Sequence, residues 1–327
     1  MKPLRVIALD DYQEVARSCG PWDRLGDDVE LVTVTEHIAD RGQLARALLG
    51  AEVVVAMRER TVFDRELLER LPDLRLLVTK GMWNDAIDLQ AASEQGVVVS
   101  GTENASDPTA ELTWALILAL TKNLVVEERA VRDGGWQRTL GGELAGATLG
   151  VVGLGKLGTR VAAVGRAFGM EVLAWSQNLR EETAHAVGVR AVTKQELLHR
   201  ADVVTLHLRL SERTRGVIGA AELDAMRSTA VLVNTARGPL VDEQALLDAL
   251  NAGVIAGAGL DVYEVEPLPV DHPLRSTPNT VLTPHVGFVT REGYEHHFHQ
   301  VVEGIAAWRE GTPVRVMNPN EHQEEPS

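Results

Sequence analysis

The sequence predicts an α/β protein built on two parallel β-sheets. Short runs of β-branched and aliphatic residues alternate with longer amphipathic stretches over most of the 327 residues, a pattern typical of βαβ units. The alternation is interrupted once, by a helical pattern over residues 107–132, and resumes near residue 148. Because a chain of this length can bury two separate cores, we expect one sheet on each side of that interruption.

Eleven strand-like runs support this fold. Five lie in the first hundred residues, LRVIALD, VELVTVT, AEVVVAM, LRLLVTKG and VVVSG. Six follow residue 147, TLGVVG, EVLAWS, DVVTLHL, AVLVNTA, IAGAGLDV and TVLTPHV. Asp242 is the expected N-cap of one helix, and Gly253 follows its end. Helices are expected over residues 107–132, 156–168, 194–201, 243–251 and 291–310.

The composition limits the classes of partner. Lys and Arg number 32 against 47 Asp and Glu, so the net charge of -15 argues against nucleic acid or an anionic membrane as the main partner. The single cysteine, Cys19, excludes an internal disulfide and is typical of a reducing compartment. No apolar run approaches the length of a signal peptide core or a membrane span. We therefore expect a cytoplasmic location.

A glycine-rich turn predicts a dinucleotide site. The run GVVGLGKLGTRVA follows a strand-like segment and opens a helix, with its glycines in G-x-G-x-x-G spacing. One glycine turns the chain, the second lets backbone approach a pyrophosphate, and the third lets helix pack on strand. Phosphates would lie at the helix N-terminus, where free N–H groups favour negative charge. The expected cofactor contacts are Gly153, Gly155, Lys156, Leu157 and Gly158.

Three ionisable residues follow predicted strands of the same sheet. Arg237 follows AVLVNTA, Glu266 follows AGAGLDVYEV, and His285 follows TVLTP. Alone, each has an ordinary structural explanation: an arginine capping a strand, a solvated loop acid, a structural histidine. Ligands of open parallel sheets bind at the carboxyl ends of the strands, so the three together favour a catalytic site. There Arg237 would bind a carboxylate, His285 would exchange a proton, and Glu266 would orient the imidazole.

With these residues assembled, the chain resembles the D-isomer-specific 2-hydroxyacid dehydrogenase family over nearly its whole length. Four ordered segments carry the resemblance: LAGATLGVVGLGKLG, VNTARGPLVDEQAL, GLDVYEVEP and LTPHVG. It places the substrate-binding arginine on Arg237, its histidine-paired acid on Glu266 and the catalytic histidine on His285. The reaction it implies is reversible reduction of a 2-keto acid to a D-2-hydroxy acid by NAD(P)H.

The resemblance also implies a domain organisation. Two Rossmann-like parallel-sheet domains would enclose a cleft, and the substrate domain would be discontinuous. Residues 1–101 and 286–327 would form the substrate domain, and residues 102–285 the NAD(P)-binding domain. Family members are commonly homodimers, so a homodimer is expected.

Further positions carry over one by one. Asp261 matches an acid close to the nicotinamide carboxamide, and Thr235 and Ala236 line the cofactor side of the arginine segment. His207 lies in a segment similar to a cofactor loop of the family, with Arg209 in place of its proline. In the N-terminal domain GMWNDAID resembles the substrate loop, Gly81, Met82 and Trp83, whose backbone amides help hold the carboxylate. Trp83 replaces a usual glycine, and it either shapes the pocket or packs between the domains.

The segment AWSQNLR bears on the choice between NAD and NADP. It ends the second strand of the dinucleotide unit, where an acid would bond the ribose 2′-hydroxyl and repel a 2′-phosphate. Ser176, Gln177 and Asn178 stand there instead and can donate hydrogen bonds, and Arg180 can supply charge. This predicts a slight preference for NADP over NAD. Alternatively Arg180 faces solvent at the start of the next helix, and both cofactors are accepted.

Other functions remain open on the same scaffold. An NAD(H)-sensing corepressor-like binding protein is one alternative, and a relative acting on formate or phosphite is another. The histidines His296, His297 and His299 suggest a metal site. In a helix, residues 296 and 299 share a face, but no third ligand is evident beside them, so a solvated helix surface is favoured. No metal is expected.

Overall fold

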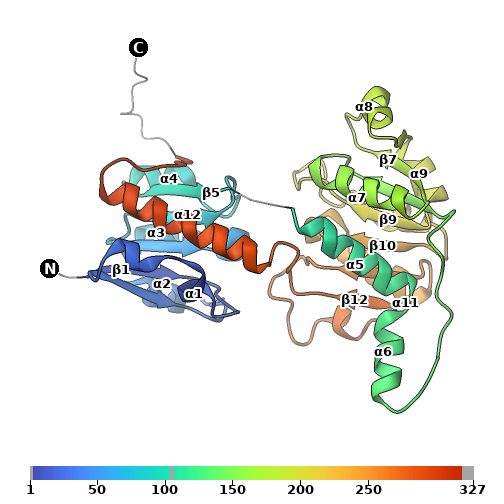
Figure 1. The fold of residues 1–327 in the computed structure, drawn as a ribbon, viewed down its shortest axis with the longest axis horizontal. Coiled ribbons are helices and arrows are strands. Elements are labelled where there is room, and N and C mark those ends of the chain that lie inside the picture. The colour runs from blue at the N-terminus through green and yellow to red at the C-terminus, as the bar shows by residue number, and fades with distance from the viewer. Residues whose placement is uncertain (1–2, 104–106, 319–327) are drawn as a thin grey trace. The chain divides into compact units, whose positions relative to one another are not determined.

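The computed structural model describes residues 3–103 and 107–318, and these form two compact units. Unit 1 contains residues 1–106 and 289–327, and unit 2 contains residues 107–288. The chain therefore leaves unit 1, completes unit 2 and returns to unit 1, so unit 1 is discontinuous in sequence (Figure 1).

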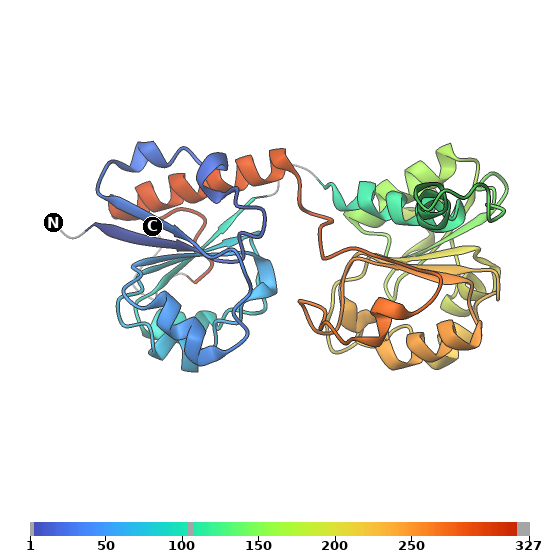
Figure 2. The same ribbon diagram turned by 90° about the horizontal axis from the view of Figure 1, so that it is seen from below.

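Unit 1 is a five-stranded parallel sheet in the order β2-β1-β3-β4-β5. The core on one face of the sheet is mostly aliphatic, with Phe63 as its aromatic member, and α2, α3 and α4 cover it. The long helix α12 covers the other face together with α1 and η1 (Figure 2). The strands are β1 Leu4–Ala8, β2 Val29–Thr33, β3 Val53–Ala56, β4 Leu76–Lys80 and β5 Val98–Thr102. The helices are α1 Ala16–Cys19, η1 Trp22–Leu25, α2 Arg41–Leu48, η2 Arg58–Arg60, α3 Arg65–Glu69, α4 Leu89–Glu94 and α12 Arg291–Arg309.

Unit 2 is a seven-stranded parallel sheet in the order β12-β11-β10-β9-β6-β7-β8. Helices α5, α7 and α8 pack on one face, and α9, α10 and α11 on the other. The strands are β6 Thr148–Val152, β7 Glu171–Trp175, β8 Arg190–Ala191, β9 Val203–Leu206, β10 Val231–Asn234, β11 Gly257–Leu260 and β12 Thr280–Leu282. The helices are α5 Thr109–Thr121, α6 Leu124–Arg132, α7 Lys156–Ala167, α8 Glu181–Ala186, α9 Lys194–Arg200, α10 Ala220–Asp224, η3 Gly238–Leu240, α11 Glu243–Ala252 and η4 Pro273–Ser276.

The strand order of unit 2 places the glycine turn at a topological switch point. β6 lies between β7 and β9, so the strand order reverses direction at β6. Ligands of open α/β sheets bind at such a point. The expected caps of α11 are present: Asp242 accepts a hydrogen bond from Ala245 N, and Gly253 ends the helix with a φ of 69°. The α/β class predicted from the sequence is confirmed.

The single helix predicted over residues 107–132 is wrong. The segment forms two helices, α5 and α6, bent by 66° at Lys122-Asn123. Asn123 adopts the left-handed conformation, with φ 50° and ψ 36°, and asparagine tolerates it better than most residues. The apolar periodicity continues across the break, which is why the sequence pattern did not reveal it.

No single helix in the described part of the chain is long and apolar enough to cross a membrane. Among the described residues, one bent pair of helices, α5–α6, meets that test of length and composition when the two are taken together. α5 contributes Trp114, Leu116 and Ile117 to the core of unit 2.

Candidate active site

The glycine turn after β6 has the geometry that a bound pyrophosphate requires. Gly153 has a φ of 102°, and a Cβ there would lie 2.7 Å from the carbonyl carbon of His207 on the neighbouring strand. A Cβ on Gly158 would lie 2.0 Å from the carbonyl oxygen of Gly153, so α7 packs directly on the turn. At Gly155, the N-cap of α7, a Cβ would meet nothing within 4 Å. The middle glycine thus faces open space at a helix N-terminus, and the turn fits a dinucleotide phosphate.

Lys156 and Leu157 begin α7 immediately after this turn. The Lys156 ammonium lies 2.9 Å from the Asp107 carboxylate, and Arg160 lies 3.6 Å from the same oxygen atom. Lys156 is well exposed, so its charge remains close to the helix N-terminus while Asp107 partly neutralises it. The backbone amides of the first turn are therefore the main anion donors here.

The residues after β7 contain no acid, as the sequence indicates. Ser176 is half-buried in a turn closed by a hydrogen bond from Leu179 N to its carbonyl, and Gln177 and Asn178 are exposed. Arg180 is exposed and occupies the N-cap position of α8. Three side chains able to donate hydrogen bonds thus follow β7, and one cation follows them.

His207 and Thr235 end β9 and β10 at the same edge of the sheet. Burial lowers the pKa of His207 to about 4, so its imidazole is neutral, and it lies within hydrogen-bond distance (3.0 Å) of Thr205. Thr235 is buried and shares a 2.7 Å hydrogen bond with Thr113 of α5. Ala236 donates its amide to the Asn234 side chain. The side chains of these residues are uncharged and lie beside the glycine turn.

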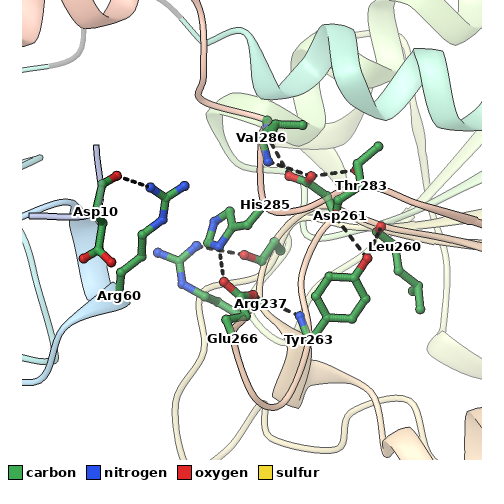
Figure 3. Close-up of polar contacts among 12 residues, drawn as sticks. Asp10, Arg60, Arg237, Leu260, Asp261, Tyr263, Glu266, Thr283, His285 and Val286 are labelled. Carbon is green, nitrogen blue, oxygen red and sulfur yellow. Dashed lines mark hydrogen bonds and ion pairs between the residues drawn. The ribbon is translucent and has the colours of Figure 1, made fainter. Parts of the chain in front are cut away.

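His285 and Glu266 form the central ionisable pair. Nδ1 of His285 lies 2.5 Å from Oε2 of Glu266, and the other carboxylate oxygen accepts a hydrogen bond from Tyr263 N (Figure 3). Burial by itself would raise the pKa of Glu266, but the hydrogen bond and charge of His285, the Tyr263 amide and the charge of Arg237 lower it below its usual value. Glu266 is therefore ionised at neutral pH and holds the imidazole by one nitrogen.

The backbone around His285 is held in an uncommon conformation by Asp261. His285 has a φ of 52°, which is unusual for a residue other than glycine. Asp261, 1% exposed, accepts hydrogen bonds from the Thr283 hydroxyl and from the amides of Val286 and Gly287 at 2.7–2.8 Å. Burial is the main reason that the pKa of Asp261 is raised. This acid therefore fixes the turn that presents the histidine.

Arg237 follows β10 and begins the 3-10 turn η3. The Asn234 side chain donates to the Arg237 carbonyl at 2.8 Å, and the guanidinium of Arg237 donates to the carbonyl of Ala236. Gly238 permits a close approach, since a Cβ there would lie 2.0 Å from the backbone of Tyr263. This approach brings the arginine loop against the loop that carries Glu266, which explains the effect of Arg237 on the pKa of that acid.

Two supporting residues were not found by sequence reasoning. Tyr263 donates its hydroxyl to the carbonyls of Leu260 and Thr283, so it ties the ends of β11 and β12 together. Asn234 orders the arginine loop. Both lie inside the segments that resemble the family. Neither their spacing nor their charge marks them as functional in the sequence, because they act through hydrogen bonds to the backbone.

The predicted substrate loop lies in unit 1, at the carboxyl end of β4. Gly81 has a φ of 98° and donates its amide to the Thr102 hydroxyl at 3.3 Å. Met82 and Trp83 are exposed, the tryptophan by 56%, and the indole N–H donates to Asp85. Asn84 is buried and anchors the loop through the Arg58 carbonyl and the Thr79 hydroxyl.

The histidine cluster of α12 differs from the solvated surface that was expected. His299 is exposed and His296 is half-buried, but His297 is 0% exposed. α12 packs against β4 and β5 on the His297 side, and helical spacing cannot show how wide that packed face is. Within the described ranges, no group of three His, Cys, Asp or Glu side chains is placed to hold a metal ion.

Comparison with known proteins shows which family the chain resembles. Residues 114–287 match the family model for the D-isomer specific 2-hydroxyacid dehydrogenase NAD binding domain. A glyoxylate reductase of Aeropyrum pernix is 40% identical over 266 residues, which cover 78% of this chain and 79% of the relative. Among solved structures, an oxidoreductase from Ralstonia solanacearum superposes with a TM-score of 0.92 at 37% identity, covering 97% of both chains. D-lactate dehydrogenase from Aquifex aeolicus, complexed with NAD and lactic acid, superposes with a TM-score of 0.76 at 29% identity, covering 94% of this chain and 96% of its own.

The fold, the glycine turn and these matches define an NAD-binding oxidoreductase with two Rossmann-like units. The chain belongs to the D-isomer-specific 2-hydroxyacid dehydrogenase family. It is an enzyme that acts on the CH-OH group of donors and interconverts 2-keto acids and D-2-hydroxy acids. The enzyme predicted from the sequence is confirmed, and the corepressor-like and formate or phosphite alternatives are not favoured.

Proposed function

We propose that His285 is the acid–base catalyst of keto-acid reduction and that Glu266 orients it. The bond between Nδ1 and the Glu266 carboxylate carries this assignment, because it leaves Nε2 to exchange a proton with the substrate oxygen. When bound, the nicotinamide supplies the hydride to the keto carbon. Protonated His285 gives its proton to the carbonyl oxygen in that direction and takes it back in the reverse. Glu266, ionised, stabilises the imidazolium in between.

Arg237 binds the substrate carboxylate in this proposal. Its guanidinium can hold a carboxylate through two parallel hydrogen bonds, and η3 keeps its backbone against the Glu266 loop. The loop of Gly81, Met82 and Trp83 in unit 1 contributes backbone amides to the same group. The substrate domain would then comprise residues 1–101 and 286–327, which include most of unit 1, and residues 102–285 would form the cofactor domain. Small 2-keto acids such as glyoxylate are the proposed substrates, in keeping with the Aeropyrum pernix relative.

The cofactor would be held by Gly153, Gly155, Lys156, Leu157 and Gly158 at the phosphates. His207, Thr235, Ala236 and Asp261 would line the nicotinamide side. Ser176, Gln177, Asn178 and Arg180 would surround the adenosine ribose, and we propose a slight preference for NADPH over NADH. The absence of an acid at residues 176–180 supports this preference, because an acid at the end of β7 would repel a 2′-phosphate.

The oligomer is proposed to be a homodimer formed through α6 and the segment after it. Leu124, Val125, Val126 and Val131 are each at least half exposed, and Trp136 and Leu140 are 73% and 96% exposed. Glu127 of α6 accepts hydrogen bonds from the backbone of Arg138 and Thr139, which holds this segment beside the helix. An apolar surface of this kind is typical of a protein interface, and a second copy is its proposed occupant. Replacing Val126 and Leu140 by Asp should give a monomer in analytical ultracentrifugation, and an unchanged sedimentation coefficient would contradict the proposal.

We also propose a cytoplasmic location. The one cysteine, Cys19, is a buried free thiol, which suits a reducing compartment. Neither nucleic acid nor a membrane is a proposed partner, given the net charge of -15.

The test is steady oxidation of NADH and NADPH with glyoxylate, hydroxypyruvate and phenylpyruvate. Turnover with at least one keto acid is expected, and kcat/KM should be higher with NADPH. Arg237→Gln should raise KM for the keto acid by roughly 10- to 100-fold, since a charged hydrogen bond to the carboxylate is lost. Arg215→Gln, which removes only an exposed ion pair with Glu264, is the matched control. An unchanged KM in Arg237→Gln would contradict the carboxylate assignment, and a higher kcat/KM with NADH would contradict the cofactor preference.

A further inference from the structure

His297 is a fully buried histidine in a helix that the reaction does not use. It lies on α12, is 0% exposed, and its Nδ1 lies 3.0 Å from the hydroxyl oxygen of Thr102 at the end of β5. Its other nitrogen, Nε2, is buried and has no hydrogen-bond partner in the part of the chain that the structure describes. An unsatisfied polar atom of this kind weakens the fold, whereas an aromatic ring without nitrogen would not carry that cost.

The hydroxyl of Thr102 connects His297 to the substrate loop. It accepts a hydrogen bond from the Gly81 amide at 3.3 Å and lies 3.4 Å from the carbonyl oxygen of Thr79. A hydroxyl group has one proton and two acceptor lone pairs. All three contacts are satisfied only if Gly81 N–H and His297 Nδ1–H both donate to the oxygen while the hydroxyl proton points to Thr79. This assigns the Nδ1–H tautomer to His297 and leaves Nε2 as an unpaired acceptor.

The surroundings keep His297 neutral and therefore keep this tautomer. Burial, and then the nearby charges of Lys80, Arg58 and His296, lower the pKa of His297 well below its usual value. A second proton would have to be placed on the buried Nε2, beside cations. The neutral imidazole can therefore donate to Thr102 at neutral pH.

Two more contacts hold the same segment against α12 and β5. Lys80, which precedes Gly81, donates its ammonium to the Gly293 carbonyl in the first turn of α12 at 3.0 Å. At Gly101 a Cβ would lie 2.5 Å from the Gly81 carbonyl oxygen and 2.7 Å from the Met82 sulfur, so only glycine allows β5 to lie this close to the loop. The start of the loop is therefore fixed on both sides, while Met82 and Trp83 extend into solvent.

We propose that His297 is a positioning residue: acting through the Thr102 hydroxyl, it fixes the Gly81 amide and so sets the backbone of the loop that receives the substrate carboxylate. The Gly81 amide is used within the protein. The next amide, of Met82, makes no hydrogen bond to any described residue and is left for the ligand. The inference rests on the proposed role of this loop in binding the substrate, and it adds the residues that hold it in place.

The first test uses His297→Phe, with His299→Phe on the exposed side of the same helix as the matched control. His297→Phe should keep or raise the melting temperature, because a buried ring replaces an unpaired acceptor. KM for the keto acid should rise about fivefold to tenfold, as expected for one lost hydrogen bond, with kcat and the Kd of the reduced cofactor unchanged. In His297→Asn, whose side-chain amide can reach Thr102, KM should return close to the wild-type value. Equal KM values in His297→Phe and His299→Phe would overturn the proposal.

A second test does not depend on activity. Amide hydrogen exchange at Gly81 should be faster in His297→Phe and in Thr102→Val than in the wild type, and the double variant should exchange no faster than either single variant. Nitrogen-detected NMR of the wild type should show His297 protonated at Nδ1. Unchanged Gly81 exchange, or an Nε2–H tautomer, would refute the positioning network even if the enzyme reduces keto acids. If the variants lose protection at Gly81 but the wild type turns over no keto acid, the positioning network is supported and only the proposed function is contradicted.

Discussion

The two sheets place functional side chains at the same kind of edge but hold them by different means. In unit 2 the residues after β10, β11 and β12 are charged and are paired with one another, as in the bond between His285 and Glu266. In unit 1 the start of the loop after β4 is held by neutral groups, Thr102 and His297, and Lys80, which precedes the loop, is buried. Proton transfer requires an ionisable group in a fixed orientation, which the charged pair supplies, whereas a contact made by backbone amides requires only a backbone in a fixed place.

The largest effect is expected at the charged pair of unit 2. His285→Ala should lower kcat by about 10²- to 10⁴-fold, because the proposed proton donor is removed, while the Kd of the cofactor changes little. His272→Ala is the matched control, since His272 also bonds a glutamate, Glu243, at 2.9 Å in the same unit. Stopped-flow and steady-state kinetics would measure both variants. Turnover of His285→Ala within a few-fold of the control would show that the charged pair is structural.

The next effect concerns the buried cation of unit 1. Burial and the charge of Arg58 lower the pKa of Lys80 to about 8, from an ordinary value of 10.5. Below pH 8 the lysine is charged in both the folded and unfolded states, and the full cost of burying that charge is present. Between pH 8 and 10.5 the unfolded chain binds more protons, so stability rises with pH, by at most about 3 kcal/mol.

This pH dependence is checked by urea unfolding at pH 7 and pH 10. Between pH 7 and pH 10 the free energy of unfolding should increase more for the wild type than for Lys80→Met. Lys122→Met, which removes an exposed lysine bonded to the Gly142 carbonyl, should follow the wild type. Parallel pH profiles for the wild type and Lys80→Met would mean that the ammonium is solvated, and the contrast between the two units would weaken.

A smaller effect is expected when the partner of the histidine is made neutral. Glu266→Gln keeps the size of the side chain but removes the charge that stabilises the imidazolium, so kcat for keto-acid reduction should fall about 10- to 30-fold. The effect is measured as kcat for keto-acid reduction beside that of the wild type under the same conditions. An unchanged kcat would leave Glu266 with an orienting role only.

The smallest effect belongs to the exposed tip of the unit 1 loop. Trp83→Gly should change kcat/KM several-fold and in opposite directions for small and bulky keto acids, if the indole shapes the pocket. The indole is 56% exposed and its hydrogen bond to Asp85 lies at the surface, so stability should change little. An unchanged order of preference from glyoxylate to phenylpyruvate would assign Trp83 a purely structural place.

Most of the fold follows from local patterns. Each of the eleven predicted strands is present, because a buried parallel strand needs a continuous apolar run and such runs are short and bounded by turns. The two-residue strand β8 was missed, since a pair such as Arg190-Ala191 has no periodicity to detect. The break at Asn123 was missed because a single left-handed residue leaves the apolar spacing on either side intact.

The site was predictable to the extent that it depends on strand ends. In a parallel sheet every carboxyl end lies at one edge, so the order of elements alone brings the glycine turn, Arg237, Glu266 and His285 to the same side of unit 2. The sequence by itself thus determined the class of fold, the dinucleotide turn and the ionisable residues beside it. These features depend on contacts between residues near in sequence and on a general property of parallel sheets.

Only the tertiary structure decided how those residues are held. Asp261 is bound to the turn of His285, Gly238 allows the arginine loop to touch Tyr263, and His297 reaches Thr102 from a helix almost two hundred residues further along the chain. Each of these depends on which face of an element is buried and on how closely two backbones approach. Such contacts join residues distant in sequence, so they become visible only when the packed chain brings them together.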